Sequence, residues 1–171
     1  MSPRAAWRLE VFGFTEVYDY VGGKQDWMAA GLPFEGTRAD LPTAGTVARA
    51  DVPTCRLDER LGDVRDRVDE AGWDLCVAVN EHRVVLGLLK QQQLDGDRDA
   101  LIDDAMRSPS TFRPHVGIVE MADVMTEHDM STATVTTSDG VLVGVLRRED
   151  ATRAALEVHR HHEHGDDDDE P

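Results

Sequence analysis

Residues 84–89, with the sequence VVLGLL, have a counterpart later in the chain, residues 141–146, with the sequence VLVGVL. Each stretch is an apolar run with glycine in fourth place, and each follows a polar turn. The two glycines lie 57 residues apart, and the same offset holds without a gap back to Thr54 and Thr111. In this alignment, apolar residues of the first copy mostly correspond to apolar or small residues of the second. A fixed offset of this kind indicates one structural unit that is built twice.

The composition is that of a soluble globular protein, because 40% of the 171 residues are hydrophobic and 30% are charged. A chain of this length buries a core without disulfides. No apolar run approaches the roughly 20 residues that a membrane helix needs, and the N-terminus lacks an apolar signal core. Cys55 and Cys76 form no disulfide framework, and we expect them to be buried, inert thiols on strands. These features predict a cytoplasmic protein.

The net charge narrows the classes of partner. It is -16 at neutral pH. A field of this sign repels nucleic-acid phosphates and anionic lipid headgroups. We therefore expect neither a nucleic acid nor a membrane as partner.

The first repeat, with its connecting helix, covers residues 51–106. Leu61, Val64, Val68 and Ala71 recur at helical spacing and predict one buried helix face, which Gly72 ends. The predicted elements are a strand at 54–56, a helix capped by Asp58, a hairpin of strands 75–79 and 84–89, and a helix at 98–106 with Leu101 and Ala105 inward.

The second repeat covers residues 107–160 and follows the same order. A strand is predicted at 110–113, and Pro114 suits the first turn of the following helix. The hairpin is predicted at 133–136 and 141–146, and a final helix at 149–162. The buried helix face is predicted from four apolar side chains: Ile118, Met121, Ala122 and Met125.

The remaining segments have a different character. Residues 1–36 predict a helix that ends at Gly13, a strand at 16–20, and a helix at 24–30 stopped by Gly31. Residues 37–50 are predicted to be a linker, because small residues, proline and glycine dominate there. Residues 161–171 form a tail rich in His and Asp, for which we expect disorder. Its histidines do not form a recognised zinc spacing, so no metal site is predicted.

Residues 1–36 resemble the C-terminal third of a rhodanese domain. That family moves sulfane sulfur through a cysteine persulfide, and its cysteine lies in a loop just ahead of the helix that begins here at Ser2. No cysteine precedes Cys55 in this chain, so the resemblance implies no catalytic residue and no enzyme. Two explanations are left open: a reading frame that begins upstream of Met1, or a fusion that has lost the loop. The matching residues are Ser2, Ala5-Ala6, Leu9, Gly13-Phe14, Val17-Tyr18, Gly22-Gly23-Lys24, Asp26-Trp27 and Ala30-Gly31-Leu32-Pro33.

A β-α-β-β-α unit that occurs twice resembles a tandem pair of cystathionine-β-synthase (CBS) domains, often called a Bateman module. The resemblance covers about residues 48–160 and implies an α/β (α+β) fold in which a pseudo-twofold relates the repeats. Its most specific feature is a seven-residue sequence motif. The motif consists of a glycine, two apolar residues, a threonine or serine, any two residues, and an aspartate. The second repeat gives Gly144 to Asp150, with Arg147 at the hydroxyl position. The first repeat gives Lys90 at that position and Gln93 in place of aspartate.

The resemblance implies that the pair binds an adenosine-containing ligand, such as AMP, ATP or S-adenosylmethionine, in a cleft between the repeats. A carboxylate at a helix start can accept hydrogen bonds from both ribose hydroxyls, and an arginine can bind phosphate with two hydrogen bonds. We expect at most one good ribose site, at Asp150. The candidate ligand-binding residues are Asp150, Arg147, Arg148, Gly144, Arg113, Arg56 and Lys90.

Each candidate also has a simpler interpretation. Asp150 is a possible helix cap, Arg147 a solvated residue at a helix start, and Arg56 and Arg113 surface ion-pair partners. Trp73, which follows the helix stop, is predicted to cover the core. The leading hypothesis is a non-catalytic sensor module that passes occupancy to a partner or to its own homodimer. The alternatives are a sulfurtransferase in a longer form of the chain, and a purely structural dimerisation module.

Overall fold

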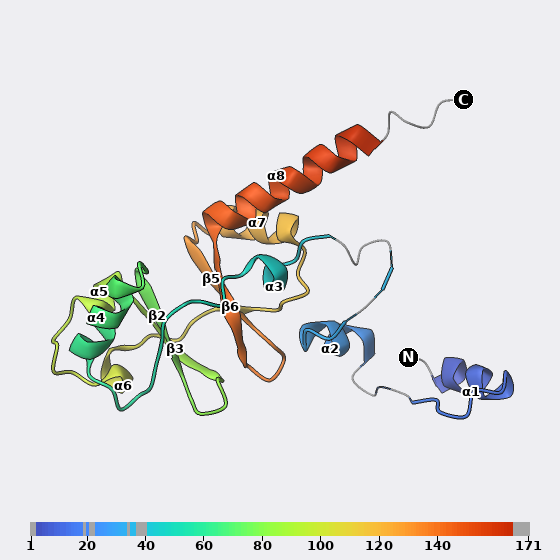
Figure 1. Cartoon of the computed structure of the whole chain (residues 1–171), viewed down its shortest axis with the longest axis horizontal. Helices are drawn as coiled ribbons and strands as arrows, with labels where there is room; N and C mark the ends of the chain where they lie inside the picture. The colour runs from blue at the N-terminus through green and yellow to red at the C-terminus, as the bar shows by residue number, and fades with distance from the viewer. Residues whose placement is uncertain (1–2, 19, 21–22, 34, 37–40, 166–171) are drawn as a thin grey trace.

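A computed structural model of the chain describes residues 3–18, 20, 23–33, 35–36 and 41–165. The body has a mixed α+β architecture with two small three-stranded sheets. Each sheet carries helices on one side, and the sheets meet along their hairpins (Figure 1).

The first sheet has the strand order β1-β2-β3, with β1 and β2 parallel and β2 and β3 antiparallel. All five residues of β2 are buried, as expected for the central strand of a covered sheet. Its elements are β1 (Thr54–Cys55), α4 (Leu61–Glu70), β2 (Leu75–Val79), β3 (Val85–Lys90), α5 (Gln91–Leu94) and α6 (Ile102–Ala105).

The second sheet repeats this arrangement as β4-β5-β6. Its last helix is much longer than the single turn of α5, and it projects beyond the sheet (Figure 1). Its elements are β4 (Thr111–Phe112), α7 (Ile118–Glu127), β5 (Thr132–Thr136), β6 (Leu142–Arg147) and α8 (Arg148–Gly165).

The internal repeat is confirmed down to the strand register. The ladder of the first hairpin shifts between Ala78 and Val79, and that of the second between Val135 and Thr136, again 57 residues on. The predicted helix faces are confirmed as well, because Leu61, Val64 and Val68 are buried in α4 and the four predicted apolar residues are buried in α7. Ala71, by contrast, is exposed.

Two short backbone segments, one ahead of each sheet, cross over and pair with a strand of the opposite sheet. Arg49 pairs with Val145 of the second repeat, through N–H···O bonds of 2.9 and 3.0 Å in the two directions. Arg107, the first residue of the second repeat, pairs in the same way with Leu88 of the first. The hairpins also meet beside their turns, where the N–H of Leu142 donates to the carbonyl of Arg83. These crossings join the two sheets into one body.

Part of the predicted linker is structured, which corrects the interpretation of residues 37–50. Thr43 caps α3 (Ala44–Val47), where its side chain accepts from the N–H of Thr46. Ala44 is buried in the second core. This helix is the counterpart of α6, because both lie just ahead of a segment that crosses to the other repeat. Residues 37–40 lie outside the described residues.

Several helix ends also differ from the prediction. Helix α4 begins after Arg60, so Asp58 is not its cap, and the N–H groups of Leu61 and Gly62 donate to the carbonyls of Ala100 and Arg98. Helix α7 begins at Ile118 and not at Pro114. The predicted helix at 98–106 is reduced to α6, in which Ile102 and not Leu101 faces the core. Residues 161–165, predicted to be disordered, continue α8; residues 166–171 lie outside the described part.

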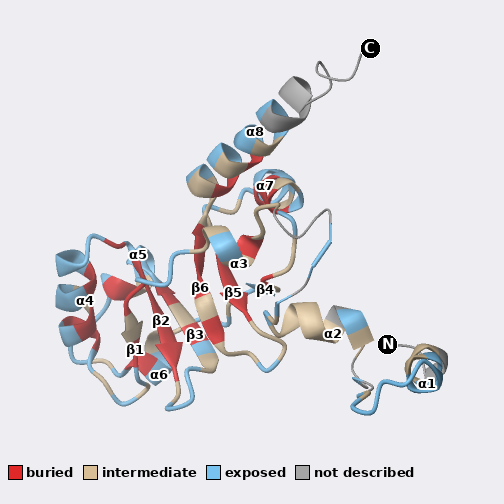
Figure 2. Ribbon diagram, turned by 45° about the vertical axis from the view of Figure 1, so that its right-hand side comes forward, coloured by how far each residue is buried: buried red, intermediate tan, exposed pale blue. Residues whose placement is uncertain are grey.

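The N-terminal segment contains α1 (Pro3–Val11) and α2 (Gly23–Ala29), as predicted. The predicted strand is absent from its described residues, 16–18 and 20, and Asp19 lies outside them. Trp7, Val11 and Phe12 are exposed on or just after α1, which lies apart from the sheets (Figure 2). Helix α2 is nearer, and the N–H of Ser138 donates to the carbonyl of Ala29.

Each sheet has its own hydrophobic core. The first core gathers around α4 and β2 and also takes Leu142 and Val145 from the second repeat. The second gathers around α7, β5 and the start of α8 (Figure 2). Among the described helices, none has both the length and the apolar character that crossing a membrane requires.

Candidate functional site

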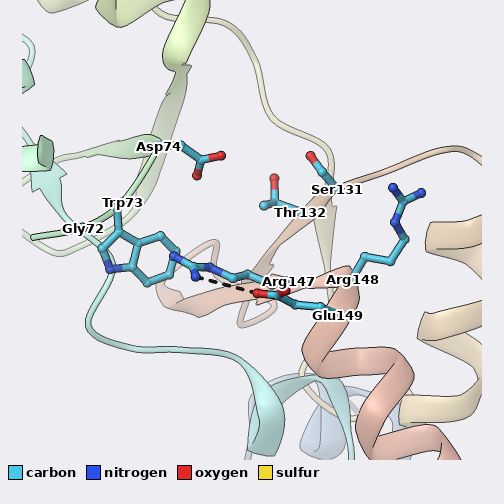
Figure 3. A pocket seen from close by; sticks show the side chains of 8 residues that line it. All are labelled: Gly72, Trp73, Asp74, Ser131, Thr132, Arg147, Arg148 and Glu149. Carbon is cyan, nitrogen blue, oxygen red and sulfur yellow. Dashed lines mark ion pairs between the residues drawn. The ribbon is translucent and has the colours of Figure 1, made fainter.

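A cleft of about 490 Å³ lies between the two repeats, where β2, β5 and α8 begin (Figure 3). The first repeat contributes a turn that follows α4, and the second contributes the start of β5 and the junction of β6 with α8. The cleft therefore exists only when the two repeats are packed together. Its lining residues are Gly72, Trp73, Asp74, Ser131, Thr132, Arg147, Arg148 and Glu149.

Trp73 forms the apolar wall of this cleft. Helix α4 ends at Gly72, which has the left-handed φ of 68° that glycine adopts without strain. This turn lets the N–H of Trp73 donate to the carbonyl of Val68 at 3.1 Å. The Trp73 side chain is only 5% exposed and belongs to the first core, as predicted. Its ring nevertheless lines the cleft.

Two guanidinium groups lie over the Trp73 ring. The Cζ atom of Arg147 is 4.2 Å from the ring centroid, and that of Arg49 is 5.0 Å from it. Both distances are typical of cation–π contacts. The Arg147 side chain, which is 23% exposed, also approaches Glu149 with a nitrogen-to-oxygen distance of 3.9 Å (Figure 3). That separation is too long for a hydrogen bond, so Glu149 holds Arg147 only weakly.

Arg49 is fixed more firmly than Arg147. Its backbone is paired to β6, and its Nε and Nη2 atoms donate to both carboxylate oxygens of Asp51, at 3.1 and 2.6 Å. This paired hydrogen bond holds the pKa of Asp51 below its usual range and raises the pKa of Arg49. Both groups are therefore charged at neutral pH. Asp51 also lies close enough to Arg147 for electrostatic attraction.

The second repeat supplies the polar wall. Arg148 begins α8, and its N–H donates to the carbonyl of Ser131 at 2.9 Å. Its guanidinium donates to Asp129 at 2.9 Å. Asp129 has a φ of 48° and corresponds in the alignment to Gly72, so both repeats turn into their central strand in the same way. Arginines and the positive end of the α8 dipole thus meet at one edge of the cleft.

Asp150 lies in the first turn of α8 but is not among the residues that line the cleft. Its side chain is 19% exposed, and one carboxylate oxygen is 3.1 Å from Nη2 of Arg153 on the same helix. Arg153 is itself largely exposed. The carboxylate is near the Arg49 guanidinium, whose pKa it helps to raise. Asp150 therefore stands beside the cleft.

The other predicted site residues do not meet there. Gly144 packs against backbone, because a Cβ at this position would lie 2.6 Å from the carbonyl oxygen of Arg49. Arg113 donates to Oγ1 of Thr136 at 3.0 Å and to the carbonyl of Thr137, so it secures the second hairpin. Arg56 lines a smaller pocket of about 260 Å³, beside the turn of the first hairpin. Lys90 is exposed at the start of α5.

The second position that the internal symmetry relates to this cleft is built differently. Met130 replaces Trp73, and Lys90 replaces Arg147 in the alignment. The side-chain oxygen of Gln93, at the position of Asp150, accepts from the N–H of Lys90 at 3.2 Å and caps the single turn of α5. The two repeats share a framework but differ in polar side chains.

No group of three or more His, Cys, Asp or Glu residues that could hold a metal is found in the described part of the chain. Both cysteines are free and buried in the first sheet. A hydrogen bond with Cys55 and burial raise the pKa of the Cys76 thiol far above its usual range. Cys76 is therefore a neutral thiol at physiological pH, and thiols react as thiolates.

The sequence missed most of the cleft. Arg147, Arg148 and Glu149 lie within a family motif, although Glu149 holds a position that the motif does not specify. Asp74, Ser131 and Thr132 belong to no motif. Arg49 was assigned to a linker. One signal was available: Gly72 ends a helix and is followed directly by a large aromatic, at the edge where the strands begin.

Residues 102–157 match the family model of the CBS domain. No curated protein matches the chain. Among solved structures, the CBS domains of a transcriptional regulator from Streptococcus pneumoniae are 22% identical, with a TM-score of 0.61, over 67% of this chain and 99% of theirs. CBSX2, a CBS-pair protein of Arabidopsis thaliana, in complex with AMP, is 19% identical, with a TM-score of 0.61, over 70% of this chain and 99% of its own.

The cytosolic domain of the Mg²⁺ channel MgtE in complex with ATP is 19% identical, with a TM-score of 0.60. That match covers 66% of this chain and 48% of the MgtE chain. Likeness at these identities concerns the fold. Together, the family match over the second repeat and the shared fold over both repeats support a tandem CBS module.

Proposed function

We propose that the chain is a non-catalytic regulatory module that binds one adenosine nucleotide in the cleft between its repeats. The observation that carries the proposal is the cleft itself, which both repeats build and which combines an indole, two arginines and a helix start. Two proteins of the same fold have been solved with adenosine nucleotides, one with AMP and one with ATP.

The phosphate end of the ligand would lie against Arg147, Arg148 and the start of α8. A guanidinium forms two parallel hydrogen bonds with a phosphate, and the N-terminal end of a helix attracts negative charge. Arg147 is available for this role because it makes no short ion pair, whereas Arg148 would have to share its guanidinium with Asp129. An anionic ligand therefore suits the cleft better than S-adenosylmethionine, which carries a sulfonium cation.

The ribose would lie toward Asp150. Its carboxylate is half-buried in the first turn of α8, and its one ion pair is with the exposed Arg153. Exchange of that ion pair for two ribose hydroxyls costs little, because an exposed ion pair contributes only about 0–1 kcal/mol. The first repeat offers no equivalent, since Gln93 is used as a helix cap. A stoichiometry of one ligand per chain follows.

The proposal includes a homodimer as the form that passes on occupancy. Leu156 on α8 is 57% exposed, an apolar side chain on a helix that projects beyond the sheets. A structural dimerisation module without a ligand is the second candidate. It is favoured by the guanidinium that already covers Trp73 and by the capping role of Gln93.

Isothermal titration calorimetry with AMP, ATP and S-adenosylmethionine tests the proposal. We expect one nucleotide per chain, tighter binding of the phosphate-bearing ligands, and affinity that falls as salt is raised, because salt screens phosphate–arginine attraction. Analytical ultracentrifugation of the same samples measures the dimer. Absence of binding by all three ligands, with a stable dimer, would favour the structural module.

A further inference from the structure

Trp73 combines two properties that rarely occur together. Its side chain is almost fully buried, yet it forms a wall of the cleft between the two repeats. The cleft contains no other aromatic side chain among its lining residues. The corresponding residue of the other repeat is Met130, so the framework of the fold does not itself require an indole here.

The space over the indole is occupied by arginine. The guanidinium of Arg147 lies 4.2 Å from the ring centroid, and Figure 3 shows the two side chains side by side. A flat cation at this distance takes the place that a nucleobase would take, because bases stack on the same aromatic face. A base and the Arg147 guanidinium therefore compete for one surface.

We propose that Trp73 is the stacking platform for the base of the bound nucleotide, and that Arg147 covers this platform until the nucleotide arrives. On binding, the base displaces the guanidinium from the indole, and the freed guanidinium binds the phosphate. This inference rests on the proposed function, because it assigns the base and phosphate positions of the same cleft.

The contacts favour this exchange. The Arg147 side chain is held by the cation–π contact with the ring, by Glu149 at 3.9 Å and by attraction to Asp51. In the described part of the chain this side chain makes no hydrogen bond, so its displacement costs the cation–π contact and weak charge attractions but no hydrogen bond. Arg49, in contrast, is fixed by Asp51 and by backbone pairing, and it remains beside the ring as a second cation. Because Trp73 belongs to the first repeat and Arg147 to the second, the ligand would bridge the repeats.

A first experiment measures AMP affinity for Trp73→Leu and Trp73→Phe in the full chain. Loss of an aromatic platform typically weakens binding of a base by about 5- to 150-fold. We expect a loss of this order for Trp73→Leu, which keeps an apolar side chain but removes the ring, and recovery of most of the affinity in Trp73→Phe, which keeps a ring. Thermal unfolding establishes that each variant is folded. Equal binding by folded Trp73→Leu and the parent would overturn the inference.

A second experiment uses Arg147→Gln and does not alter the core. Adenosine should bind this variant more tightly than the parent, since the cover is removed, whereas AMP should bind it more weakly, since the phosphate contact is lost. Arg65→Gln, which removes an arginine of α4 that pairs with Asp95 away from the cleft, is the matched charge control and should change neither affinity. Changes of the same sign for adenosine and AMP in Arg147→Gln would overturn the exchange.

Fluorescence reports the platform directly. In a chain with Trp7→Phe and Trp27→Phe, Trp73 is the sole indole, and saturating AMP should change its emission because a base stacks on it. If the parent binds neither AMP nor ATP, the proposed function fails and the inference fails with it. If the parent binds AMP while the Trp73 emission stays unchanged, the inference alone fails.

Discussion

Asp150 and Gln93 occupy equivalent positions, 57 residues apart, but the structure uses them differently. The oxygen of Gln93 is committed to the backbone of Lys90 as a helix cap. The carboxylate of Asp150 has only an exposed partner on its own helix. The two repeats therefore share a backbone framework but differ in single side chains. These side chains determine which repeat can bind a ribose.

The first prediction concerns these two residues. Asp150→Ala should weaken AMP binding by about 1.5–3 kcal/mol, or roughly ten- to a hundredfold, because a charge-assisted hydrogen bond to ribose is lost. Gln93→Ala should change the affinity little and serves as the matched control. Calorimetric titration of both variants measures the effect. If Asp150→Ala binds AMP as tightly as the parent, the carboxylate serves only the helix start.

The second prediction concerns the two glycines at the centre of the repeated hexapeptides. A Cβ at Gly144 would collide with backbone, at 2.6 Å from the carbonyl oxygen of Arg49. A Cβ at Gly87 would meet the side chain of Met106, which can move. Gly144→Ala should therefore lower the free energy of unfolding by roughly 1–3 kcal/mol, and Gly87→Ala by less. Denaturant unfolding measures the loss of unfolding free energy in each variant. A larger loss for Gly87→Ala than for Gly144→Ala would show that the Arg49 backbone moves readily to accommodate a Cβ.

At the scale of elements, helix faces were predictable and helix ends were not. The buried faces of α4 and α7 follow from apolar residues three and four positions apart, which is local information. The ends depend on distant carbonyls: the first N–H of α4 donates to Ala100, and that of α7 donates to Pro42. The sequence predicts a side-chain cap at Asp58 and a first helical turn at Pro114. Both predictions are wrong, because carbonyls remote in sequence accept from the first N–H groups of the two helices.

Strands β1 and β2 carry both cysteines into the first core, and this placement gives the third prediction. The chain should have no thiosulfate sulfurtransferase activity, because the hydrogen bond with Cys55 and burial raise the pKa of Cys76 and keep it a neutral thiol. Thiocyanate formation from thiosulfate and cyanide is the assay. Turnover that disappears in Cys55→Ser or Cys76→Ser would contradict the prediction, whereas turnover that persists in both variants would indicate a contaminant.

At the scale of the whole molecule, the crossing of the two repeats explains why the structured part of residues 37–50 and half of the cleft were not predicted from the sequence. Arg49 and Arg107 make equivalent pairings but lie 58 residues apart, one more than the offset of the strands. The alignment therefore fails just ahead of Thr54, and the crossing segment was interpreted as a linker. The same reason explains why only part of the candidate site could be predicted from the sequence. Its motif half, Arg147 and Arg148, was found, whereas the half that includes Trp73 and Arg49 depends on packing between the repeats.

The fourth prediction concerns how firmly each part of the chain is held. Limited digestion with chymotrypsin should cut first in the segment between α1 and α2, where Phe12, Phe14 and Tyr18 are exposed. Cleavage near Trp27 should be slower, because Ser138 donates to the carbonyl of Ala29 at the end of α2. The body from Leu41 onward should persist, since α3 and Arg49 are built into the second repeat.

Mass spectrometry of timed samples identifies each cut, and Phe112, half-buried in β4, is the internal reference for opening of the body. Cleavage at Phe14 well before Phe112 is the expected order, because local opening of an exposed segment requires far less free energy than unfolding of a core. Simultaneous cleavage at both sites would mean that the two-sheet body opens as readily as the N-terminal segment. Resistance at all of these sites would mean that α1 packs on the body in solution, with its exposed apolar face covered.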